Sequence, residues 1–377
     1  MRVRRMMVAT VSALVAVAMT PAAAVAAAGE TTRSQTPTMQ ELLDEVTAAG
    51  AVAAIAEVRH GSRVWRLGSG TTELGGSRPV SVGGRYRAGS ITKTFVATVA
   101  LQLVGEGRLR LTDTVERWLP GTVPQGDAIT VRDLLQHSSG LYSYTDALLP
   151  QDDRAAILKW RDHTFRPAEL VRVATARPLI FAPPGSQQGY SNTDYILAGM
   201  VIEAVTGRSY GDEIERRILR PLRLHDTQLP GARKTVARAY AHVYVPRGSG
   251  WNDPVNVTTM SPTIAGAAGE IISTTADLNR FYRALVQGWL LRPAQLREMT
   301  DPGRTGIGMG LEILELSCGR AVGHGGGGPG FFGMSFTMND GSRQITATST
   351  VWSGDPGPAL ATMLQGALCP PGRPGSR

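Results

Sequence analysis

The hydrophobic and polar positions divide this 377-residue chain into three parts. Residues 51–58 and 63–67 are β-like, and the break between them predicts a hairpin turn. From about residue 105 to 230 the pattern becomes helical. Beyond it β-like segments return, as in residues 332–338, where large apolar side chains alternate with smaller ones as in a half-buried strand. The pattern therefore predicts β elements at both ends of the chain around a helical middle.

Capping signals mark the beginnings of two predicted helices. Thr38 and Glu41 have the spacing of a capping box, in which each side chain satisfies a backbone N–H group of the other residue. Thr130 and Asp133 repeat this spacing before an apolar pair, and we expect their helix to end near residues 138–140. One helix therefore begins just after Thr38 and the other just after Thr130.

The first 28 residues have the pattern of a secretory signal peptide. Three arginines among the first five residues precede a short apolar run at residues 6–19, and small residues with A-x-A spacing follow. The run is shorter than the ~20 apolar residues of a membrane-spanning helix, so we expect cleavage near residues 26–29. We also expect a linker over residues 29–36, no membrane span in the mature chain, and secretion into the extracellular cell-wall space.

Composition narrows the classes of function. The formal net charge falls from +8 to +5 when the three arginines of the signal peptide are removed, and the remaining arginines are scattered. A mildly basic exported protein is attracted to an anionic cell wall. The chain has no arginine run interleaved with aromatic residues, so nucleic-acid binding is not indicated. We expect no metal and no cofactor, because five histidines show no metal-ligand spacing (His60, His137, His163, His225, His242).

The chain has two cysteines, Cys318 and Cys369. They fit a single disulfide in an oxidising compartment, where such bonds persist. Two free buried thiols are the alternative interpretation.

The strongest candidate chemistry lies in residues 87–95. Ser90 and Lys93 share one face if this segment is helical, and Gly89 allows a sharp turn into the helix. A serine hydroxyl needs a base, and a desolvated lysine with a lowered pKa can serve as one. Only three of the 39 basic residues are lysines. This arginine-rich chain carries a lysine at position 93, and an arginine there could not deprotonate to act as a base. The choice indicates covalent catalysis. An ordinary Ser and Lys on an amphipathic helix are the alternative interpretation.

A second candidate is Tyr190-Ser191-Asn192, which precedes a helix predicted from about residue 194 to 205. A tyrosine phenol can shuttle protons when a nearby ammonium lowers its pKa. Asn192 offers both a donor and an acceptor to a substrate amide. The alternative is a helix N-cap at Ser191 or Asn192, with Tyr190 packing beside it.

The third candidate is the glycine-rich run from His324 to Gly330. It satisfies G-x-G-x-x-G, but a strand follows instead of a helix, so a dinucleotide site is not indicated. No G-x-S-x-G elbow accompanies it, which excludes the oxyanion loop of α/β-hydrolases. We expect an edge segment against which a substrate backbone can lie. Protonated His324 would then meet a substrate carboxylate. A flexible surface loop is the alternative.

Together, Ser90-Ile91-Thr92-Lys93, Tyr190-Ser191-Asn192 and His324-Gly325-Gly326 resemble the three motifs of the serine β-lactamase and penicillin-binding family, in order and approximate spacing. The resemblance is closest to the class C β-lactamase-like branch, and within it to exocellular D-alanyl-D-alanine carboxypeptidases of the Streptomyces type. D-aminopeptidases and related esterases belong to the same branch. Connecting phrases such as ITVRDLLQHSSGL also resemble the family.

The resemblance implies an α/β fold of the α+β type. An antiparallel β-sheet flanked by helices would carry an inserted, mainly helical region, as in β-lactamases and transpeptidases. One hydrolase domain would cover residues 37–369, before a tail at 370–377. Its α/β part would span about 37–104 and 231–369, and its helical part about 105–230.

The resemblance also implies roles for single residues. Ser90 would be the acylated nucleophile, and Lys93 and Tyr190 would share the proton transfers. Asn192 would orient the substrate amide. The backbone N–H groups of Ser90 and Gly327 would form an oxyanion hole.

Two positions depart from the family pattern. His324 stands where lactamases commonly carry lysine, which resembles the carboxypeptidase and aminopeptidase branch. Gly325 stands where a hydroxyl residue usually helps to hold the substrate carboxylate, and Gly326 and Gly327 complete this predicted substrate-binding segment.

We therefore predict a secreted serine hydrolase that forms an acyl-enzyme at Ser90. The specific activity that we predict is that of a D-alanyl-D-alanine carboxypeptidase. Its partners would be peptidoglycan peptides or other small acyl substrates, with β-lactams as acylating ligands. A β-lactamase, D-aminopeptidase or esterase is the alternative within the family. A non-catalytic protein that binds wall peptides or β-lactams is the alternative of a different class.

Overall fold

The computed structural model describes residues 37–150, 153–246, 253–303, 306–351 and 353–370. The predicted signal peptide and linker, and residues 371–377 of the predicted tail, lie outside the described residues. Contacts within the chain group residues from Pro37 onward in one unit. Within the described residues, no helix combines the length and the apolar character needed to cross a bilayer.

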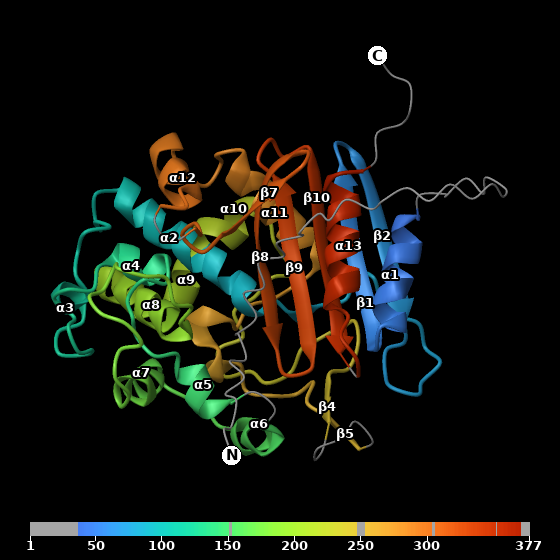
Figure 1. Cartoon of the computed structure of the whole chain (residues 1–377), viewed down its shortest axis with the longest axis horizontal. Coiled ribbons are helices and arrows are strands. Elements are labelled where there is room, and N and C mark those ends of the chain that lie inside the picture. Colours follow the sequence, from blue (N-terminus) through green and yellow to red (C-terminus); the bar gives the residue numbers. More distant parts are fainter. Residues whose placement is uncertain (1–36, 151–152, 247–252, 304–305, 352, 371–377) are drawn as a thin grey trace, which may run out of the picture. The chain divides into compact units, whose positions relative to one another are not determined.

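A six-stranded antiparallel sheet forms the centre of this unit, with the strand order β2-β1-β10-β9-β8-β7 (Figure 1). The first strands of the chain pair directly with the last one, so that Ala56 lies opposite Ala347. The predicted β elements at the two ends of the chain thus form one sheet, which confirms the predicted fold class. The strands are β1 (Ala51–His60), β2 (Arg63–Gly70), β7 (Glu312–Leu316), β8 (Gly319–Gly328), β9 (Phe331–Met338) and β10 (Arg343–Val351).

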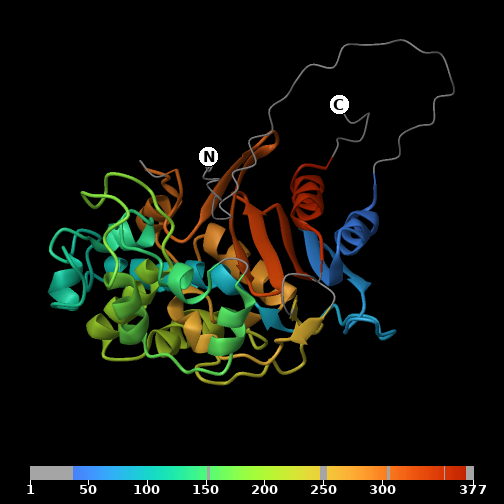
Figure 2. The same ribbon diagram turned by 60° about the horizontal axis from the view of Figure 1, so that its bottom comes forward.

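Helices cover both faces of the sheet. On one face α1 (Met39–Ala48) and α13 (Gly357–Leu368) lie side by side against the strands (Figure 2). They bury apolar side chains there, among them Leu43 and Met363. On the other face α11 (Thr275–Val286) packs on β1, β9 and β10. Burial of this apolar surface on both faces stabilises the sheet.

The helical region lies to one side of the sheet (Figure 1). It follows the buried helix α2 (Thr92–Gly105), and its described residues contain helices and loops but no strand longer than an isolated bridge. Its helices are α3 (Val115–Trp118), α4 (Val131–Leu135), α5 (Tyr144–Leu148), α6 (Arg154–Trp160), α7 (Pro167–Thr175), α8 (Asn192–Thr206), α9 (Tyr210–Ile214) and α10 (Arg220–Leu222), with a π-helical turn at Glu215–Leu219.

Short elements complete the described part of the fold. Two small two-stranded sheets pair β3 with β6 and β4 with β5. These elements are β3 (Tyr86–Arg87), β4 (Tyr244–Pro246), β5 (Pro254–Asn256), β6 (Ile272–Ser273) and α12 (Pro293–Thr300).

The predicted helix beginnings agree with the structure, but one predicted end does not. Thr38 and Glu41 form the predicted capping box before α1, and Thr130 and Asp133 form the one before α4. However, α4 ends at Leu135, before the predicted residues 138–140. The reason is local: His137 adopts a positive φ of 54°, which ends the helical path.

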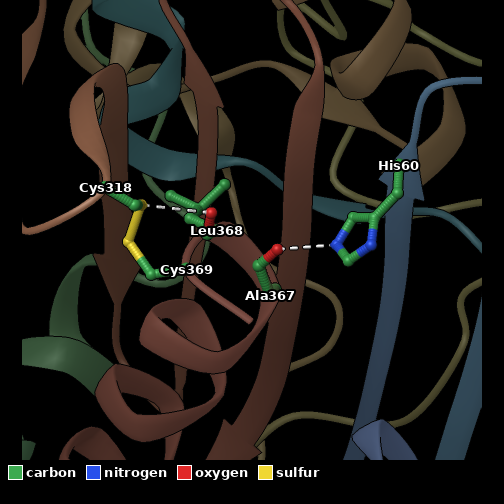
Figure 3. The surroundings of a disulfide bond; sticks show 5 residues. All are labelled: His60, Cys318, Ala367, Leu368 and Cys369. Atoms are coloured by element: carbon green, nitrogen blue, oxygen red, sulfur yellow. Dashed lines mark hydrogen bonds between the residues drawn. A yellow bond between two sulfur atoms is a disulfide. The ribbon is translucent and has the colours of Figure 1, made fainter. Parts of the chain in front are cut away.

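Cys318 lies in the turn between β7 and β8, and Cys369 follows α13; the two form a disulfide across 51 residues (Figure 3). A neighbouring hydrogen bond of 2.7 Å joins His60 Nε2 to the carbonyl of Ala367 (Figure 3). Both contacts hold the end of α13 against the sheet.

Removing this cross-link should destabilise the fold without touching the helical region. We expect Cys318→Ser/Cys369→Ser to lower the free energy of unfolding by about 4 kcal/mol, since the bond restricts a long loop in the unfolded chain. Urea unfolding of the oxidised protein and of the double variant measures the difference. A reductant should shift the unfolding midpoint of the parent protein only. Equal midpoints for the two oxidised proteins would contradict a stabilising role.

Candidate active site

Ser90 lies in a 3₁₀ turn, Gly89–Ile91, that leads directly into α2. Gly89 has a positive φ of 57°, and a Cβ there would lie 2.7 Å from the backbone nitrogen of Gly327. Only glycine fits both conditions. The prediction of Ser90 at the beginning of a buried helix is therefore correct, although its turn is 3₁₀ and α2 begins two residues later, at Thr92.

Lys93 is completely buried, and its Nζ lies 2.9 Å from Ser90 Oγ. It also lies 2.8 Å from Asn192 Oδ1 and 2.8 Å from the carbonyl of Ala268. Burial lowers the pKa of Lys93 well below its usual range, although Asp194 and Glu312 oppose the shift.

A neutral Lys93 amine has two N–H donors and one lone pair. The oxygens of Asn192 and Ala268 can only accept hydrogen bonds, so they take both donors. The lone pair then faces the Ser90 hydroxyl. In this arrangement Lys93 can accept the proton of the nucleophile.

Tyr190 completes the group around the nucleophile. Its phenol O–H donates a hydrogen bond of 2.9 Å to Ser90 Oγ. Burial raises the pKa of Tyr190, so the phenol keeps its proton. The sequence analysis considered a lowered pKa for this phenol, but burial shifts it upward, and Glu312 and Asp194 add to the shift. Ser90 Oγ therefore accepts from Tyr190, and it can direct its own hydrogen at Lys93 when that amine is neutral.

Asn192 is the first residue of α8, and both ends of its side-chain amide are hydrogen-bonded to other residues of the chain. Its Oδ1 accepts from Lys93, and its Nδ2 donates to Thr145 Oγ1 at 3.0 Å. Ser191 is the N-cap residue of α8 but makes no capping hydrogen bond with its side chain. The role of Asn192 in orienting a substrate amide stays a prediction.

His137 contributes to the site, although sequence reasoning assigned it no role. Its ring lies over the Tyr190 ring with 4.2 Å between centroids, and its Nδ1 lies 3.2 Å from Asp194 Oδ2. Both residues of this pair are buried, and burial lowers the pKa of His137. A neutral imidazole thus positions the Tyr190 phenol. The only available signal was the place of His137 in the family-like phrase ITVRDLLQHSSGL.

Residues 324–328 form the second half of β8, and we name this segment the glycine edge. Strand β7 pairs with β8 only as far as Gly323, so the glycine edge has β9 on one side and the Ser90 turn on the other. A Cβ at Gly326 would lie 2.0 Å from the carbonyl oxygen of Ala88. The predicted edge segment is thus present, and the flexible-loop alternative is wrong.

The backbone direction of the glycine edge bears on the predicted oxyanion hole. Gly325 donates its N–H to Glu312 Oε1 at 2.9 Å, so this N–H points away from β9. N–H groups two residues apart point to the same side of a strand. The N–H of Gly327 therefore points toward the turn that carries Ser90, as an oxyanion hole requires.

His324 is buried, and its Nδ1 contacts the Gly325 carbonyl and lies 3.5 Å from Glu312 Oε1. Burial lowers the pKa of His324, with Glu312 opposing the shift. Burial therefore disfavours the cationic form of His324 and Glu312 favours it. The predicted role of His324 as a cation for a substrate carboxylate stays a prediction.

The structure also bears on metal binding. Among the described residues, no three His, Cys, Asp or Glu side chains are grouped so that they could hold a metal ion.

Comparison with known proteins agrees with this geometry. Residues 37–365 match the family model described as Beta-lactamase. The chain belongs to the beta-lactamase family. A D-stereospecific amidohydrolase from Streptomyces sp. is a similar solved structure, with 40% identity, a TM-score of 0.79, and coverage of 89% of this chain and 98% of that one.

Two further beta-lactamase family relatives are more distant. The D-amino acid amidase from Ochrobactrum anthropi SV3 is 26% identical, with a TM-score of 0.73 and coverage of 87% of this chain and 94% of that one. Penicillin-binding protein 4* from Bacillus subtilis (strain 168) is 30% identical over 287 residues, which are 72% of this chain and 62% of the relative. The chain spans about half the length of several curated relatives that it matches.

The beta-lactamase family is a family of serine hydrolases, and the chain carries a site of that type. The structure brings together five of the predicted site residues from three distant segments (Ser90, Lys93, Tyr190, Asn192, Gly327). Their individual roles in turnover stay predictions.

Proposed function

We propose that this chain is a secreted serine amidohydrolase that cleaves amide bonds next to D-configured residues through an acyl-enzyme at Ser90. One observation carries the proposal: Ser90 Oγ lies 2.9 Å from the base Lys93 and 2.9 Å from the acid Tyr190. Lys93 can remove the proton during attack, and Tyr190 can protonate the leaving nitrogen.

The D-configured substrate is supported by similarity. The relatives described as a D-stereospecific amidohydrolase and a D-amino acid amidase cover most of this chain. The glycine edge adds a physical reason for an amide or peptide substrate, because a strand edge without side chains offers backbone hydrogen bonds to an extended backbone.

A second candidate is the D-alanyl-D-alanine carboxypeptidase predicted from the sequence, acting on peptidoglycan peptides. His324 at the beginning of the glycine edge favours it, since a protonated imidazole there would attract a carboxylate. The similarity to penicillin-binding protein 4* supports the same candidate.

Secretion is part of the proposal. The amino-terminal sequence has the charge, apolar run and small residues of a signal peptide. The disulfide between Cys318 and Cys369 suits an oxidising compartment.

Mass spectrometry after acid quenching tests the acyl-enzyme. We expect incubation with D-phenylalanine methyl ester or with a penicillin to add the mass of the acyl group to a peptide that contains Ser90. Ser90→Ala should show no adduct and serves as the control. Absence of an adduct with every probe, or an adduct on another peptide, would overturn the proposal.

A substrate panel separates the candidates within the family. Release of ammonia from D- but not L-phenylalanine amide would support the amidohydrolase, and release of D-alanine from an acylated D-alanyl-D-alanine peptide would support the carboxypeptidase. Acylation without turnover of any substrate would instead indicate a binding protein.

A further inference from the structure

Glu312, the first residue of β7, places a carboxylate beside the glycine edge. Its Oε1 accepts the N–H of Gly325 at 2.9 Å and lies 3.5 Å from His324 Nδ1. The Glu312 side chain is 45% exposed, so water reaches the carboxylate. A Cβ at Gly325 would lie 3.3 Å from Glu312 Oε1. The glycine therefore leaves room for this acidic group, where a larger residue would crowd it.

The position of Glu312 relates it to one part of the substrate. Gly325 and Gly327 present N–H groups on the same side of β8, and two residues of a strand span about 6.5 Å. A substrate whose carbonyl oxygen is held at Gly327 and whose chain extends along the glycine edge toward its beginning reaches Gly325. There it meets a backbone donor that Glu312 already occupies.

The leaving group is the part that extends in this direction. In the proposed function Tyr190 protonates the leaving nitrogen, so the leaving group would lie on the side of the phenol. Burial is the main cause of the raised pKa of Tyr190, and the charge of Glu312 adds to it. Glu312 also acts on the buried Lys93 and on His324. Its field thus covers the space next to the leaving nitrogen.

Glu312 contributes an acidic group to this space. The titratable groups on which Glu312 acts are Lys93, Tyr190, His324 and Tyr282. Burial shifts the pKa of Lys93 and of His324 downward and the pKa of both tyrosines upward, so burial disfavours the charged form of each group. Glu312, with its partly exposed carboxylate, is the acidic member of this group.

We propose that Glu312 is a specificity-determining residue, which disfavours leaving groups that carry a carboxylate and admits neutral or ammonium-bearing ones. The substrate class is then D-acyl primary amides, D-acyl esters, and D-acyl amides whose leaving group is neutral or carries an ammonium. This inference rests on the proposed function and deepens it. The carboxylate of Glu312 and a carboxylate on the leaving group would repel each other. At a separation of about 7 Å, and with an effective dielectric constant between that of a protein surface and that of water, this repulsion lowers kcat/KM for the charged leaving group by about 3- to 50-fold.

A pair of matched peptides tests the inference. An N-acylated D-alanyl-D-alanine peptide and the same peptide with a carboxy-terminal amide differ by one charge on the leaving group. We expect kcat/KM of the parent protein to favour the amide. Glu312→Gln keeps an oxygen acceptor for Gly325 and removes the charge, so the preference should fall about 3- to 50-fold through faster cleavage of the free acid.

Glu315→Gln is the matched control, because Glu315 lies on the same strand and pairs with Arg320 on the surface. An unchanged preference in Glu312→Gln, or an equal change in Glu315→Gln, would overturn the inference. If Glu312→Gln does not fold, salt provides the test, since 1 M NaCl shortens the screening length to about 3 Å. The preference of the parent protein should then fall, and a salt-independent preference would overturn the inference.

The two proposals fail in different ways. Absence of any acyl adduct at Ser90 with either peptide would overturn the proposed function itself. An adduct with both peptides at equal rates would preserve the serine hydrolase and remove only the role of Glu312.

Discussion

Replacing Lys93 by arginine is expected to lower kcat/KM by about 10²- to 10⁴-fold, which is the usual contribution of a positioned general base. Arginine keeps the donors for Asn192 and Ala268, but its guanidinium does not deprotonate in a protein. It therefore has no lone pair for the Ser90 hydroxyl. Acylation rates with an activated D-acyl ester measure the loss.

Controls for this variant come from the other two lysines. Lys159→Arg and Lys234→Arg make the same chemical change on the surface, and we expect both to keep parent activity. The parent protein should also lose kcat/KM as the pH falls through the lowered pKa of Lys93, because protonation removes the lone pair. A Lys93→Arg protein that folds and retains activity within tenfold of the parent would exclude Lys93 as the base.

Gly326→Ala is expected to lower kcat/KM by about 10²-fold or more, although the alanine is small and apolar. Its methyl group would lie 2.0 Å from the carbonyl oxygen of Ala88. Neither a Cβ atom nor a backbone carbonyl can rotate away, so the backbone itself must shift. The glycine edge must then move away from the Ser90 turn. The N–H of Gly327 moves with it, and loss of one oxyanion donor typically costs 10²- to 10³-fold.

Gly83→Ala serves as the control for this change, because a Cβ at Gly83 meets nothing within 4 Å. Thermal unfolding of both variants separates misplacement of the strand from loss of the fold. Parent-like acylation by Gly326→Ala would mean that the approach of the glycine edge to Ser90 does not set the rate.

The sequence was sufficient for the fold class and the candidate nucleophile, for identifiable reasons. Capping boxes are local, so Thr38 and Thr130 mark their helices without knowledge of the rest of the chain. Three motifs in one order are also readable without coordinates. The spacing of Ser90 and Lys93 has a single helical interpretation, and the structure places their side chains 2.9 Å apart.

Other properties depended on neighbours that are distant in the sequence. The pKa of Tyr190 rises mainly because of burial, and burial cannot be read from Tyr190-Ser191-Asn192. His137 ends α4 early and packs on Tyr190, although 53 positions separate the two residues. Glu312 belongs to none of the three sequence motifs. Its approach to Gly325 follows from the register of β7 on β8.

The pairing of β1 with β10 has a consequence for the order of events during biosynthesis. Residues near Ala56 leave the ribosome early, but their partners near Ala347 emerge only when almost the whole chain has been made. The glycine edge belongs to the same late segment. Contacts this far apart in sequence form slowly, so an incomplete chain holds Ser90 and Lys93 without the strand that faces them. The candidate site is therefore complete only once the last strands have joined the first.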